Sequence, residues 1–81
     1  MFFTYVLRSL ASRRFYTGHT DDIDDRIVRH NQGRVPATRK KGPWQLVFKK
    51  EFETRSEAVR FELYLKSLKG NATFRRIVGA G

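Results

Sequence analysis

The lack of cysteine is the feature that most constrains how this chain can fold. Small domains bury a modest share of their surface, and many depend on disulfides or metal thiolates for stability. With 81 residues, this chain must instead be held by a single hydrophobic core. Its 7 Phe, 3 Tyr and 1 Trp, within a hydrophobic fraction of 40%, are enough to build one. A disulfide scaffold, a thiolate metal site and a cysteine nucleophile are all excluded.

The charge of the chain is strongly positive and unevenly spread. Lys and Arg number 17 against 8 Asp and Glu, which gives a net charge of +9. Residues 1–32 carry five Arg against four Asp, whereas residues 33–81 carry 12 cations against four Glu. A field of this sign attracts polyanions, so nucleic acid is the expected partner, although a high charge also serves solubility.

No apolar run approaches the ~18 residues that a membrane span needs. The opening run from Phe2 to Leu7 has no basic leader, and Arg8 ends it too early for a signal peptide. We therefore expect a cytoplasmic protein without a membrane partner.

The first half of the chain predicts a β-hairpin followed by a helix. Residues 2–10 are rich in Phe, Tyr, Val and Leu, and residues 15–18 resume extended structure after a turn at 11–14. Thr20 is the predicted cap of a helix that ends at 31–33. The first turn holds acidic side chains, and the buried edge holds two isoleucines: Asp21, Asp22 and Asp24, then Ile23 and Ile27.

The second half predicts a basic loop at 33–43, a strand at 44–52 with imperfect alternation, and two helices. The first of these helices begins at a capping box, carries an apolar stripe and stops at a glycine: Thr54 with Glu57, then Ala58, Phe61, Leu65 and Leu68, then Gly70. Residues 71–78 predict a last short helix. The order ββα-βα(α) predicts an α+β fold, with a small three-stranded antiparallel or mixed sheet flanked by helices. We expect one domain over 1–81, with its core at about 2–78.

Arg26 and His30 stand four residues apart on one face of the first predicted helix. A permanent cation beside a group that titrates near neutrality suits a phosphodiester site. Helix-surface ion pairs are the alternative for the arginines, because Asp22 precedes Arg26, and Asp25 precedes Arg29, by four residues.

Glu62 borders the buried stripe of the second long helix, so its carboxylate needs a partner. Lys66 at i+4 offers an ordinary ion pair. A divalent cation is the alternative, since one carboxylate with phosphate oxygens and waters is a usual way to hold Mg²⁺.

Tyr5 and Tyr16 lie on the two arms of the predicted hairpin, either as core aromatics or as a general base. We expect Arg26 and a bound metal to lower the tyrosine pKa by favouring the phenolate. The basic loop supplies four cations for a nucleic-acid backbone: Arg34, Arg39, Lys40 and Lys41. Trp44 follows the loop as a candidate ring for stacking on bases.

The order of these residues resembles the GIY-YIG nuclease domain, and most closely its small stand-alone members of the UPF0213 type. Phe3-Thr4-Tyr5 stands for Gly-Ile-Tyr, and Tyr16-Thr17-Gly18 for Tyr-Ile-Gly. Arg26, His30 and Glu62 match the family's arginine, histidine and metal-binding glutamate. Further matching stretches are Arg29-His30-Asn31-Gln32-Gly33, Thr38 to Pro43, and Tyr64 to Ser67.

This resemblance implies a divalent-metal-dependent endonuclease that hydrolyses DNA, with selectivity for structure or single strands. Tyr5 would deprotonate the attacking water with help from Tyr16 and His30, and Arg26 would stabilise the phosphorane. Glu62 would hold Mg²⁺ or Mn²⁺, while Lys66 and the loop cations would grip the strand. Two alternatives stay open: a nucleic-acid-binding module without catalysis on the same fold, and a repair scaffold that depends on a protein partner. The oligomeric state is not predicted.

Overall fold

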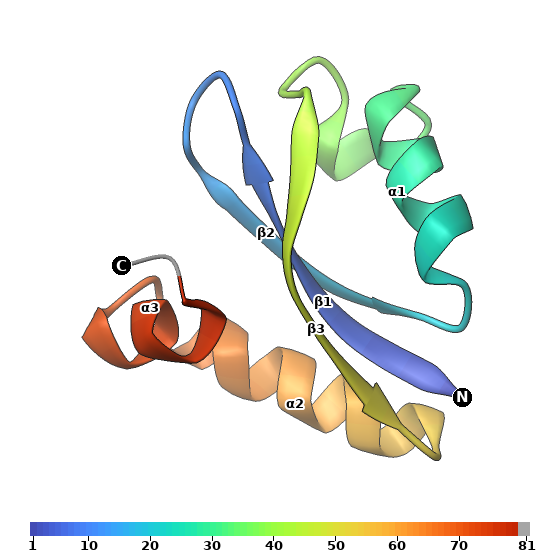
Figure 1. Cartoon of the computed structure of the whole chain (residues 1–81), viewed down its shortest axis with the longest axis vertical. Helices are drawn as coiled ribbons and strands as arrows, with labels where there is room; N and C mark the ends of the chain where they lie inside the picture. Colours follow the sequence, from blue (N-terminus) through green and yellow to red (C-terminus); the bar gives the residue numbers. More distant parts are fainter. Residues whose placement is uncertain (80–81) are drawn as a thin grey trace.

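The computed structural model describes residues 1–79, and its elements follow the predicted order (Figure 1). They are β1 (Phe2–Ser9), β2 (Phe15–Thr20), α1 (Ile23–Asn31), a 3₁₀ turn η1 (Pro36–Thr38), β3 (Trp44–Phe52), α2 (Arg55–Ser67) and α3 (Ala72–Val78). The α+β prediction is confirmed. The 3₁₀ turn, which lies inside the predicted basic loop, was not expected.

The sheet is antiparallel throughout, with β1 in the centre and the order β2-β1-β3. Helix α1 covers one face, and α2 and α3 cover the other (Figure 1). Alternation along β1 divides the core accordingly, because successive side chains of a strand point to opposite faces. Tyr5 and Leu7 pack with Ile23 of α1, whereas Val6 packs with Leu65 of α2 and with α3.

A β-bulge explains the imperfect alternation of the third strand. Val6 pairs with Phe48 and Leu7 with Leu46, so Val47 has no partner across the β1–β3 ladder. Both Val47 and Phe48 consequently pack in the core on the α2 side.

Two predicted helix boundaries were wrong by one or two residues. Asp22, not Thr20, caps α1, because its carboxylate accepts from the Asp25 N–H while the Thr20 hydroxyl closes a turn on Asp22. After α2, the left-handed conformation begins at Lys69 (φ 50°), one residue before Gly70. The capping box of Thr54 and Glu57 is confirmed.

Candidate active site

Gly18 on the edge strand β2 determines where the candidate site can form. It lies directly across from Tyr5 on β1. A Cβ at Gly18 would lie 2.7 Å from Tyr5 Oη and 3.2 Å from Tyr16 Cε2. Only a glycine lets both tyrosine rings approach the strand backbone this closely. The glycine of the Tyr-x-Gly tripeptide is therefore required by contact, not by a turn.

Tyr5, His30 and Thr38 form a buried chain of hydrogen bonds. Tyr5 Oη lies 2.8 Å from His30 Nε2, and His30 Nδ1 lies 2.7 Å from Thr38 Oγ1. The Thr38 hydroxyl donates in turn to the carbonyl of Val35. All three bonds are satisfied when neutral His30 carries its proton on Nδ1, so that Nε2 accepts from the Tyr5 hydroxyl. Tyr16 closes the cluster, with its ring centroid 4.9 Å from that of His30.

The pKa values of this cluster favour neutral groups. Burial, and to a smaller extent the nearby Arg26 charge, lower the pKa of His30 to about 4. Burial raises the pKa of Tyr5, and Tyr16 and Glu62 also raise it. Arg26 lowers the Tyr5 pKa as expected, but burial outweighs it in the protein without a metal.

Arg26 is not explained by a surface ion pair. Asp25 does pair with Arg29, at 2.7 Å, but the Asp22 carboxylate caps the helix instead of bonding Arg26. Within residues 1–79, Arg26 makes no ion pair, and it is half-buried. Its charge acts on both Tyr5 and His30, which places it beside them.

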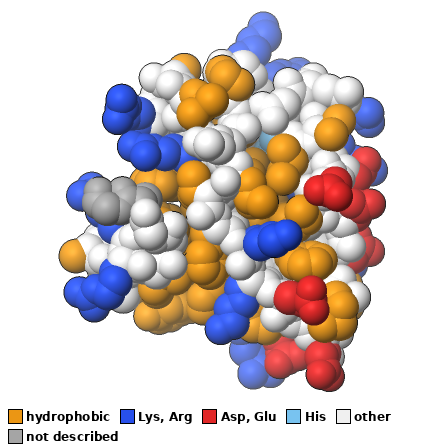
Figure 2. Space-filling model, in the orientation of Figure 1, with side chains coloured by type: hydrophobic (Ala, Val, Ile, Leu, Met, Phe, Trp, Pro, Cys, Tyr) orange, Lys and Arg blue, Asp and Glu red, His pale blue; other side chains and the backbone are white. Residues whose placement is uncertain are grey.

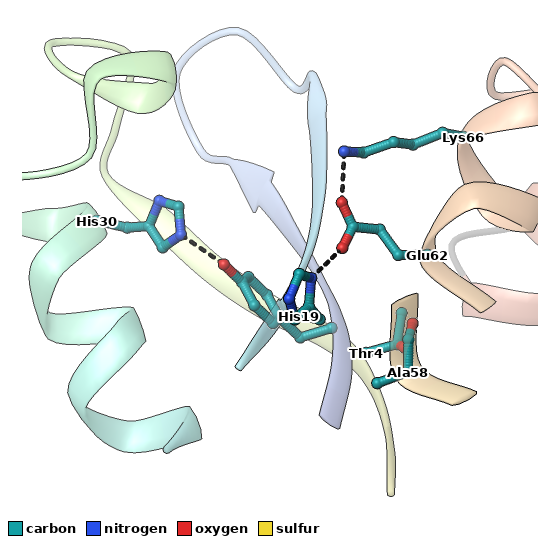
Figure 3. Close-up of polar contacts among 7 residues, drawn as sticks. Thr4, His19, His30, Ala58, Glu62 and Lys66 are labelled. Carbon is teal, nitrogen blue, oxygen red and sulfur yellow. Dashed lines mark hydrogen bonds and ion pairs between the residues drawn. The ribbon is translucent and has the colours of Figure 1, made fainter. Parts of the chain in front are cut away.

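Glu62 reaches the same edge strand from α2, on the other face of the sheet. Its Oε2 accepts from the Lys66 ammonium, and its Oε1 lies 2.5 Å from His19 Nδ1 (Figure 3). The ion pair with Lys66 matches the ordinary alternative from the sequence. His19, on β2, is the site residue that sequence analysis missed.

The two groups of side chains lie close together around the edge of β2. Figure 3 shows His30 approaching from α1, and Glu62 and Lys66 from α2. The Glu62 charge raises the pKa of Tyr5, so the carboxylate is within electrostatic range of the phenol. Of the five predicted site residues, Tyr5, Tyr16 and His30 contact one another, and Arg26 and Glu62 each influence the pKa of Tyr5, Glu62 from the other face of the sheet.

The predicted backbone-binding cations do not lie together on the surface. Arg39 and Lys40 line a groove of ≈ 670 Å³ that also includes His30, whereas Arg34 and Lys41 lie outside its lining. Arg34 bonds to the Gln32 side chain. Lys66 lies on the opposite side of the site, in a second groove.

A metal ion would have Glu62 as its main protein ligand. No group of three or more His, Cys, Asp or Glu side chains in residues 1–79 is arranged to hold a metal. A single carboxylate still fits a hard divalent cation that takes its other ligands from phosphate and water. His19 or Lys66 must release an oxygen for such an ion to bind, and both are partly solvent-exposed.

Comparison with known families identifies the family of this chain. The family model of the GIY-YIG catalytic domain matches residues 1–75. The chain belongs to the GIY-YIG family. This membership associates it with nuclease-type activity on nucleic acid and with the divalent metals that such nucleases generally use.

Within residues 1–79, none of the helices is long and apolar enough to span a bilayer.

Similar proteins include small members of the UPF0213 group. UPF0213 protein CPE1444 of Clostridium perfringens is 36% identical over 78 residues, which cover 95% of this chain and 83% of that protein. UPF0213 protein SSP2268 of Staphylococcus saprophyticus is 42% identical over 53 residues, which cover 64% of this chain and 65% of that protein. The solution NMR structure of UPF0213 protein BH0048 from Bacillus halodurans is 32% identical, covers 94% of both chains and superposes with a TM-score of 0.49.

Proposed function

We propose that this GIY-YIG domain is a divalent-metal-dependent endonuclease that hydrolyses phosphodiester bonds of DNA. The observation that carries the proposal is the hydrogen bond from Tyr5 Oη to His30 Nε2, formed within electrostatic range of Arg26 and Glu62. A phenol that is hydrogen-bonded to a neutral imidazole can pass a proton on. It is placed beside a cation and a carboxylate, which phosphoryl chemistry needs.

Neutral His30 is the final proton acceptor in the mechanism we propose. Free phenolate is scarce because burial raises the Tyr5 pKa. Tyr5 therefore gives its proton to His30 Nε2 as it takes a proton from the attacking water. The water oxygen bonds to phosphorus, the bond to the leaving oxygen breaks, and that oxygen takes a proton from solvent. His30 then returns its proton to solvent, and the pKa of about 4 makes this release favourable.

Arg26 and Glu62 would stabilise the negative charge that develops on the phosphate, Arg26 directly and Glu62 through a metal ion. Arg26 makes no ion pair within the described residues, so its guanidinium is available to the developing phosphorane. Glu62 would hold Mg²⁺ or Mn²⁺, which when bound supplies Lewis-acid stabilisation at the phosphate. Tyr16, whose half-buried ring lies beside those of Tyr5 and His30, would position the water.

The substrate side of the proposal rests on charge. The net charge of +9 and the cations of the groove beside His30 favour a DNA backbone. We infer that Arg34, Arg39, Lys40 and Lys41 contact it on the α1 side, and Lys66 on the α2 side. A cytoplasmic location and a possible protein partner for targeting stay predictions.

The test is a Mg²⁺-dependent nicking assay on single-stranded, flapped and duplex DNA with the parent and Glu62→Gln. Removal of the carboxylate charge should lower the rate several hundredfold or more, which is roughly 4 kcal/mol of barrier. Glu51→Gln, at an exposed position on β3, is the matched control and should keep the parental rate. Equal rates for the parent and Glu62→Gln would overturn the nuclease proposal.

A binding module without catalysis is the second candidate, and the occupied carboxylate favours it. Both Glu62 oxygens already have cationic or imidazole partners, so the site is satisfied without a metal. A binder of this kind would show a steep salt dependence of affinity, unchanged in Tyr5→Phe or Glu62→Gln. Metal-dependent cleavage that those substitutions abolish would exclude it.

A further inference from the structure

A second groove begins at the candidate site and runs away from the basic loop. Its volume is ≈ 440 Å³, and it lies between the start of β2 and the junction of α2 with α3. We call it the α2–α3 groove; its lining is Arg14, Phe15, Tyr16, Thr17, Leu65, Lys66, Lys69, Gly70 and Phe74. Tyr16 is shared with the candidate site, because its ring also packs on His30.

Two of the three cations of the α2–α3 groove are available to bind an anion, whereas Lys66 pairs with Glu62. Three of the lining residues are basic and none is acidic. Within residues 1–79, Arg14 and Lys69 make no ion pair, and both are exposed. Figure 2 shows that Lys and Arg gather on the side of the hairpin end and α3, whereas Asp and Glu gather over α1 and the lower edge.

Three aromatic residues contribute to the rest of the lining, namely Phe15, Tyr16 and Phe74. Phe15 is half-buried and meets the buried Phe74 edge to face, with ring centroids 5.2 Å apart, whereas the Tyr16 ring points to the other face of the sheet, toward His30. A duplex keeps its bases stacked inside and presents phosphate and sugar. Cations beside aromatic rings in a concave surface are instead the usual platform for single strands, whose unstacked bases need apolar contacts.

We propose that the α2–α3 groove binds single-stranded DNA on the opposite side of the scissile phosphate from the basic loop. Tyr16 lines this groove and His30 lines the other, and their ring centroids are 4.9 Å apart, so a strand that occupied both grooves would pass over the candidate site. The inference rests on the proposed nuclease function for the position of the scissile phosphate. The binding surface itself rests on the lining and its charge.

The experiment measures binding in EDTA, where no metal-dependent cleavage occurs, by fluorescence anisotropy of a labelled oligo(dT) strand. Arg14→Ala/Lys69→Ala should weaken binding about tenfold and lower the salt slope by about 1.4, since each phosphate contact to a single strand contributes about 0.7. Lys49→Ala/Arg60→Ala is the control, with the same loss of net charge at exposed positions outside both grooves. It should weaken binding less than about threefold.

A cross-linking experiment gives an independent answer, because the cysteine-free chain accepts single cysteines cleanly. Lys69→Cys, just beyond the end of α2, should form a disulfide with a thiol-tethered oligo(dT) much faster than Arg60→Cys within α2. Equal cross-linking rates, or equal losses of affinity in the two double variants, would overturn the proposal that the α2–α3 groove binds DNA. If the parent binds as described but never cuts DNA, the nuclease proposal fails while the groove stands. If the parent cuts DNA and the two double variants bind DNA equally well, only the proposal about the α2–α3 groove fails.

Discussion

The two sides of the edge strand β2 hold side chains of different character. On the α1 side, Tyr5 and His30 are 1% and 2% exposed and are joined by hydrogen bonds between neutral groups. On the α2 side, Glu62 is held by His19 and Lys66, whose side chains are 30% and 50% exposed. A buried network has few alternatives, whereas exposed ion pairs are weak and exchange readily with solvent or ligands. We conclude that the α1 side is a preformed hydrogen-bonded network, the proton relay of our proposal, and that the α2 side holds a carboxylate that can exchange its partners.

The largest expected effect comes from removing the hydroxyl of the relay. Tyr5→Phe keeps the buried ring and deletes only the group that bonds to His30. We expect the rate of Mg²⁺-dependent nicking to fall several hundredfold or more, about 4 kcal/mol of barrier, with the fold retained. Tyr64→Phe, at an exposed tyrosine on α2, serves as the control. A Tyr5→Phe enzyme with the parental rate would remove the relay from the mechanism.

A smaller effect is expected when the contact at Gly18 is disturbed. In Gly18→Ala the new methyl would overlap Tyr5 Oη and displace it from His30. We expect about a hundredfold loss of rate, together with a loss of stability of about 1–3 kcal/mol in chemical denaturation. Gly70→Ala is the control. It should also destabilise the fold, because Gly70 has φ +72°, but its added Cβ would have no atom within 4 Å and so would not disturb the site. If both variants keep the parental rate, the position of Tyr5 is not critical.

The pH dependence of stability separates the buried relay from the exposed ion pairs. His30 has a pKa of about 4 in the fold against an ordinary value near 6.5, so the unfolded chain binds the proton more readily. The free energy of unfolding should therefore fall as pH falls from about 6.5 to about 4, by up to about 3 kcal/mol. Urea titrations at several pH values should show a weaker decline in His30→Asn. The same decline in both proteins would show that His30 is not buried as a neutral group.

The smallest effect is expected on the exchangeable side. Lys66→Met removes an ion pair whose lysine is half-exposed, so stability should change by no more than about 1 kcal/mol. Arg29→Ala, which breaks a pair whose cation is about as exposed as Lys66, gives the reference value in the same denaturation assay. A loss of several kcal/mol in Lys66→Met alone would show that the Glu62 side is as rigid as the relay.

Local patterns were sufficient to predict most of the fold and one half of the site. The hairpin and the following helix are short-range structures, so Tyr5, Tyr16, Arg26 and His30 could be assigned to neighbouring elements from spacing alone. The capping box gave the start of α2 for the same reason.

Features that depend on long-range packing were not predictable. His19 meets Glu62 only because the hairpin register points it to the α2 face, opposite Thr4, and α2 packs there. The raised pKa of Tyr5 depends on burial beneath elements distant in sequence, which outweighs the neighbouring Arg26. A clue to His19 existed, since a carboxylate beside the apolar stripe needs partners and the chain has only two histidines.

A double-mutant cycle on the nicking rate tests most directly whether the two sides of β2 form one active site. The four enzymes are the parent, Tyr5→Phe, Glu62→Gln and the double variant, assayed under identical Mg²⁺ and DNA concentrations. Groups that act on one phosphate as a unit are strongly non-additive, so the double variant should be about as slow as the slower single variant. A double variant slowed by the product of the two single effects would show that Tyr5 and Glu62 act independently, and would contradict the single site.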